Sequence, residues 1–130
     1  ASLFTLKENT MQKKVGCVTA IIGCEEGFGI AAGQERTLEI RILNNVKAYG
    51  NLPHTVKIKL WLPEEFTADK SEFDIFAPHW TPFTLDCISE SKTIKLKAGE
   101  TVNAVNEVLV EVSVSDSFSR EFIALNFIAE

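Results

Sequence analysis

The sequence has little of what most catalytic and membrane proteins display. Its 130 residues include only three cysteines, two histidines, one methionine and one tyrosine. No apolar stretch approaches the roughly 20 residues that a helix needs to cross a bilayer, so we expect no membrane insertion. A basic surplus is also absent, because 13 lysines and arginines stand against 18 acidic residues and give a net charge of −5. Nucleic-acid binding needs a basic face that displaces counterions, so we expect no nucleic-acid partner.

The three cysteines, Cys17, Cys24 and Cys87, form no Cys-x-x-Cys pair, and no His-x-x-x-His occurs. A zinc site needs closely spaced ligand pairs, so we expect no metal. An odd number of thiols cannot pair completely within one chain. If Cys17 and Cys24 share one strand, their spacing of seven points them to opposite faces. A bridge from Cys87 to one of them stays open, and our interpretation is that all three are small buried apolar residues.

Catalytic motifs are also missing. The sequence has no nucleophile elbow, and its glycines at 23, 27, 29 and 33 open no helix that could bind a phosphate. The residues 27–29, Gly-Phe-Gly, are instead typical of a bend between two strands. We therefore expect a protein that is not an enzyme and needs no cofactor.

Alternation of polar and apolar side chains dominates what is there. It is clearest in five segments, namely 36–43, 55–62, 93–97, 108–114 and 121–129. Alternation of this kind is typical of strands that bury one face. Residues 14–24 are apolar on both sides and predict one further strand, and 3–7 and 72–76 are shorter candidates.

Turn residues separate these segments, and no sustained helical repeat is visible. Strands that are polar on one face must bury the other face against a second sheet. We therefore predict an all-β fold, an immunoglobulin-like antiparallel β-sandwich of seven to eight strands. Residues 1–130 are expected to form a single domain of this kind.

Three motifs in order resemble a known family. Residues 33–45 are a glycine turn and a strand ending in Asn-Asn, residues 56–66 end in Leu-Pro-Glu-Glu-Phe, and residues 94–101 end in Ala-Gly-Glu-Thr. This order resembles bacterial immunoglobulin-like accessory domains of the CARDB and NPCBM-associated kind. A second, weaker resemblance is to the carboxy-terminal immunoglobulin-like domains of transglutaminases.

The resemblance implies a spacer, binding module or packing partner beside an enzyme or adhesin, with no catalytic residues to carry over. We therefore expect a non-catalytic accessory or protein-interaction module of a larger surface or secreted protein. Its partner would be a protein or a neighbouring domain. The alternatives are a self-associating structural protein, hence a homo-oligomer, and a carbohydrate-binding module that takes a polysaccharide on exposed tryptophans.

Two places are candidates for the contact surface. The segment 77–83, Ala-Pro-His-Trp-Thr-Pro-Phe, is stiffened by two prolines and displays His79, Trp80 and Phe83. These aromatics either contact a ligand or partner, or close the open end of the sandwich.

The second candidate is Trp61, which by alternation faces away from the core beside Lys57 and Lys59, with Leu43 as a candidate neighbour. A covering loop is the alternative. If the strands at 55–62 and 93–97 share one sheet, these lysines and Lys95 and Lys97 form a basic stripe for an acidic partner or polysaccharide. Otherwise they are an ordinary solvated face that discourages aggregation.

Overall fold

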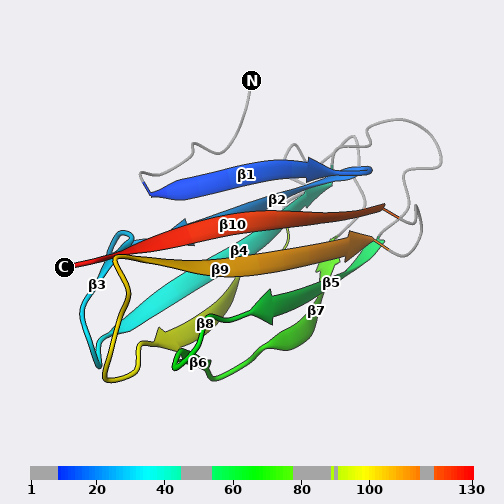
Figure 1. Ribbon diagram of the computed structural model, residues 1–130. Helices are drawn as coiled ribbons and strands as arrows, with labels where there is room; N and C mark the ends of the chain where they lie inside the picture. The colour runs from blue at the N-terminus through cyan, green and yellow to red at the C-terminus, as the bar shows by residue number, and fades with distance from the viewer. Residues whose placement is uncertain (1–8, 45–53, 78–88, 90, 115–118) are drawn as a thin grey trace.

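The computed structural model describes residues 9–44, 54–77, 89, 91–114 and 119–130. The strands in chain order are β1 (Thr10–Val15), β2 (Val18–Cys24), β3 (Gly29–Ile30), β4 (Glu35–Asn44), β5 (His54–Trp61), β6 (Thr67–Ala68), β7 (Glu72–Ala77), β8 (Lys92–Lys97), β9 (Val105–Val114) and β10 (Ser119–Ala129). Sheet A has the order β1-β2-β4-β8-β6, and sheet B has the order β3-β10-β9-β5-β7 (Figure 1).

Side chains from the inner faces of both sheets form one hydrophobic core. Strand β9 shows how alternation builds it, because Val108, Val110, Val112 and Val114 are fully buried while the residues between them face outward. The matching residues of β4, Leu38, Ile40 and Ile42, are buried from the opposite sheet. The predicted all-β class and its packing as a two-sheet sandwich are confirmed.

The predicted segments at 36–43, 72–76, 93–97, 108–114 and 121–129 fall within β4, β7, β8, β9 and β10. The segment at 55–62 matches β5 except that the strand ends at Trp61. The described residues contain ten strands rather than seven to eight, partly because β3 and β6 are only two residues long. Such short strands carry too few residues for alternation to be visible. The candidate strand at 3–7 lies outside the described residues.

The prediction of a single strand over residues 14–24 is wrong. The chain forms a hairpin there, in which β1 pairs antiparallel with β2 from Thr10 opposite Gly23 to Val15 opposite Val18. Gly16 makes this tight turn with a φ of 59°, a left-handed conformation that glycine adopts without strain. The hairpin adds β1 to the edge of sheet A, so Cys17 lies in the turn and does not share a strand with Cys24.

Residues 27–29 form the expected bend, and they carry the chain from sheet A to sheet B. After β2, Gly27 adopts a φ of 89°, and β3 then pairs parallel with the end of β10. This pairing makes sheet B mixed rather than purely antiparallel. The crossing also brings the turn before β4 next to Glu130, where the described chain ends.

Candidate interaction surface

Trp61 lies on the outer face of sheet B, as the alternation of β5 predicts. Its side chain is 47% exposed, whereas Ile58 and Leu60 on the same strand are buried. Lys57 and Lys59 share its outer face, and both are accessible to solvent. The sequence therefore placed the tryptophan and its two lysines correctly.

The Trp61 ring is held in place although it is exposed. Its indole Nε1–H donates a hydrogen bond of 2.9 Å to the Glu111 Oε1. The Lys59 Nζ lies 4.2 Å from the ring centroid, a cation–π contact worth about 0.5–1 kcal/mol at an exposed site. Lys59 stands directly opposite Glu111 across the β5–β9 pair, so both contacts arise from strand register.

Glu111 connects Trp61 to β10. Its Oε2 forms an ion pair of 3.1 Å with the Arg120 Nε, and its side chain is only 14% exposed. The Arg120 guanidinium in turn lies 5.1 Å from the Phe122 ring centroid. We call Lys59, Trp61, Glu111, Arg120 and Phe122 the tryptophan network. It crosses β5, β9 and β10 on the exposed side of sheet B.

The tryptophan network borders an apolar row. Leu109 lies opposite Trp61 on β9, and Ala124 lies opposite Leu109 on β10. Sequence analysis missed Glu111, Arg120 and Phe122 as parts of this surface. Alternation places Glu111 outward, but no local signal tells which lysine or tryptophan stands across from it.

The structure decides two points about this surface that the sequence left open. Lys95 and Lys97 belong to β8 in sheet A, whereas Lys57 and Lys59 belong to β5 in sheet B. The outer faces of the two sheets point away from each other, so the four lysines form no common stripe. Leu43 is in β4 of sheet A, and it is therefore not a neighbour of Trp61.

The other predicted contact segment cannot be placed. His79, Trp80 and Phe83 lie outside the described residues, and so does Cys87. The possible bridge from Cys87 is therefore untested. Of the other cysteines, Cys24 is buried as predicted, and Cys17 is partly buried against the core.

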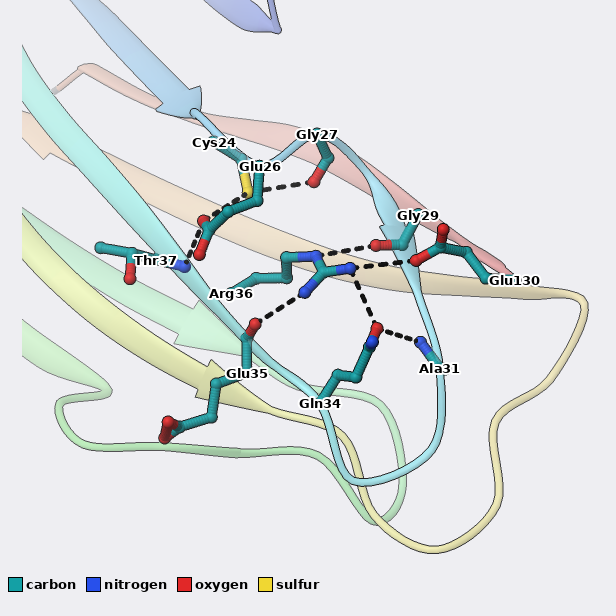
Figure 2. Close-up of polar contacts among 10 residues, drawn as sticks. All are labelled: Cys24, Glu26, Gly27, Gly29, Ala31, Gln34, Glu35, Arg36, Thr37 and Glu130. Atoms are coloured by element: carbon teal, nitrogen blue, oxygen red, sulfur yellow. Dashed lines mark hydrogen bonds and ion pairs between the residues drawn. The ribbon is translucent and has the colours of Figure 1, made fainter.

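A second polar cluster surrounds Arg36 at one end of the sandwich (Figure 2). The Arg36 side chain is only 13% exposed. Its Nε donates to the Gly29 carbonyl at 2.8 Å, and its Nη1 donates to the Glu35 carbonyl at 2.9 Å. Its Nη2 bonds both Gln34 Oε1 and Glu130 Oε1 at 3.0 Å. With its donors occupied by protein oxygens, Arg36 acts as a structural clamp that joins β3, β4 and the end of β10.

Cys24 lies beside this clamp, and its surroundings argue against a reactive thiol. Burial, and after it the nearby charge of Glu26, raises the pKa of Cys24 above its usual value. The Sγ–H donates to the Gly27 carbonyl at 3.1 Å. Because nucleophiles and metal ligands use the thiolate, a thiol held protonated suits packing better than chemistry.

The described residues lack two further features. No group of three or more histidine, cysteine or acidic side chains is placed to hold a metal ion in this part of the chain. The described part also has no helix with the length and apolar character to span a membrane.

Comparison with known proteins gives the fold alone. No protein-family model matches the chain, and no curated protein matches it. A FixG-related protein from Vibrio parahaemolyticus is similar in structure, with a TM-score of 0.59 at 11% identity over 89% of this chain and 99% of that one. WR4, an MSP family member of C. elegans, aligns with a TM-score of 0.49 at 7% identity over 84% and 97% of the two chains. At such identities the first likeness supports the sandwich architecture and says nothing about a ligand or partner.

Proposed function

We propose that this chain is a non-catalytic protein-interaction module, an accessory domain of a larger protein, that binds its partner through the tryptophan network. The observation that carries the proposal is the fixed exposure of Trp61. The ring is 47% exposed, yet Glu111 and Lys59 hold it in one position. A rigid aromatic side chain loses little entropy on binding, and tryptophan is among the residues most often found at interface hot spots.

The surroundings of Trp61 favour a protein over a polysaccharide. A sugar ring stacks on an open aromatic face, but the Lys59 ammonium already covers one face of this indole. The indole N–H is also engaged, by Glu111. Charges of both signs alternate around the ring, since Lys57 stands opposite Asp74 and Lys59 opposite Glu72 across the β5–β7 pair. A protein surface with mixed charges and an apolar anchor fits such a pattern.

The test compares Trp61→Ala with Phe76→Ala in the tagged chain, expressed at native level in its own cells. Phe76 is a matched control because it is an aromatic residue of the same sheet that is 61% exposed but lies on the edge strand β7. Quantitative co-purification should recover a partner with the wild type and with Phe76→Ala. Trp61→Ala should lose it by about 30-fold, which corresponds to a hot spot of about 2 kcal/mol.

Circular dichroism and the urea midpoint must show that both variants fold. A partner retained equally by both variants would contradict the proposal. Saturable binding to members of a polysaccharide panel, abolished by Trp61→Ala, would replace it with the carbohydrate-binding alternative. Loss of a homo-oligomer in light scattering on the same substitution would replace it with self-association.

A further inference from the structure

Among the described residues, strand β10 has an open edge. One side of β10 pairs with β9 from Ser119 to Ile128. The other side pairs only at its end, where β3 lies parallel to Ile128 and Ala129. Among the described residues no strand pairs with that side between 119 and 127. Unpaired backbone groups along a strand edge are a template for another extended chain.

Backbone hydrogen bonds show which residues face this edge. The Ala129 N–H donates to the carbonyl of Ala104, the residue before β9, at 3.1 Å. The Ile128 N–H donates in the opposite direction, to the Phe28 carbonyl beside β3, at 2.8 Å. Because these directions alternate along a strand, the even-numbered residues of β10 present their N–H and C=O groups to the open edge.

The composition of this edge favours pairing with itself. Residues 122–128 read Phe-Ile-Ala-Leu-Asn-Phe-Ile and contain no charged residue, proline or glycine. Segments of six or seven residues with this character are those that associate with copies of themselves when an edge is exposed. A second copy of the same chain is therefore the occupant that matches the edge best.

The charged side chain of Lys13 lies beside the open edge and occupies one of its backbone acceptors. Lys13 lies on β1 opposite Ala20, which is fully buried, so the lysine points to the inner side of sheet A. From there its Nζ reaches across to sheet B and donates to the Phe122 carbonyl at 3.1 Å. An inward-pointing charge beside an open edge is a recognised protection against strand addition, because an incoming strand would displace and desolvate it.

We propose that the open edge of β10 is a strand-addition site for a second copy of this chain, and that Lys13 keeps the site closed. Once Lys13 is removed, two β10 strands pair antiparallel about a two-fold axis at Ile123. This register pairs the backbone N–H and C=O groups of the even-numbered residues, which face the open edge. It also avoids β3 at the end of the strand. It places Arg120 opposite Asn126 and Phe122 opposite Ala124, so no like charges face each other.

The experiment compares Lys13→Ala with Lys14→Ala by sedimentation velocity over a concentration series. Lys14 is the next residue and carries the same charge, but it lies opposite Thr19 on the outer side of the hairpin. We expect Lys13→Ala to form a dimer at concentrations where the wild type and Lys14→Ala stay monomeric. Its dimer dissociation constant should be at least about tenfold lower than theirs. An equal effect of both substitutions would mean that losing any lysine of the hairpin promotes association, and it would overturn the proposal. So would no effect of Lys13→Ala.

A second substitution tests the register. Adding Asn126→Lys to Lys13→Ala places an ammonium group opposite Arg120 of the other copy and should return the protein to a monomer. The monomer accommodates this change, because Glu107 stands opposite Asn126 on β9. A dimer that persists in this double variant is not formed by the β10 edge in this register, and the proposal would fail. Trp61→Ala leaves this edge intact, so failure here and failure of the proposed function are separable.

Discussion

Replacing Arg36 by alanine should destabilise the fold more than any other change of a single charged residue at this end of the sandwich. The Arg36 side chain is 13% exposed. It lies on the inward face of β4, the face that also carries Leu38 and Ile40. Its strongest bond is the partly buried one from Nε to the Gly29 carbonyl at 2.8 Å. Gly29 is itself one of the two β3 residues that pair with β10, so the clamp holds the register of the crossing segment.

The magnitude follows from how exposed each bond is. A hydrogen bond from a charged donor contributes about 1.5–3 kcal/mol when partly buried. The remaining partners of Arg36 are exposed, including Glu130 with a side chain 56% exposed, and screening leaves them with about 1 kcal/mol or less together. We therefore expect Arg36→Ala to lower the free energy of unfolding by about 2–4 kcal/mol.

Urea unfolding followed by circular dichroism measures this loss, and Arg41→Ala is the matched control. Arg41 lies on the same strand, but it faces outward, is 36% exposed, and has one ion pair of 3.0 Å with Glu39. Its Nε is buried and has no hydrogen-bond partner among the described residues, so its removal also relieves an unfavourable group. We expect Arg41→Ala to change stability by less than about 1 kcal/mol. Equal losses for the two variants would refute the clamp.

Two further predictions concern stability. Gly99→Ala should lower the urea midpoint, because an added Cβ would lie 2.7 Å from the Glu65 backbone carbonyl oxygen. The expected loss in the free energy of unfolding is about 1–3 kcal/mol. An unchanged midpoint would contradict this and show that the 63–66 turn can shift. Because burial raises the pKa of Cys24 above its usual value of 9.0, the folded state holds that proton more tightly than the unfolded state. The corresponding stability is complete below about pH 9 and is lost as the pH rises through the folded pKa. The free energy of unfolding should therefore fall more steeply above pH 9 in the wild type than in Cys24→Ala, and parallel slopes would contradict this account.

Alternation along the chain was enough to predict the main strands and the side each residue takes. Val108 to Val114 are buried at every second position, and Trp61 is exposed, because side-chain direction in a strand depends only on local backbone geometry. The turns were predicted less completely than the strands. Gly16 reverses the chain between the mostly polar β1 and the apolar β2, and without a polar residue at the turn the end of β1 and the whole of β2 resembled one continuous buried strand.

Which strands pair with each other was decided only by the tertiary structure. The sequence alone determined that Lys57, Lys59, Lys95 and Lys97 point outward, but sheet membership separated them onto opposite faces. Register alone brought Glu111 to Trp61, and packing of the two sheets alone brought Lys13 to β10. Pairing joins segments far apart in the chain, and a strand with one apolar face satisfies that face equally well in either sheet. The choice between sheets therefore rests on the connections and on how the whole core packs, which no single segment encodes.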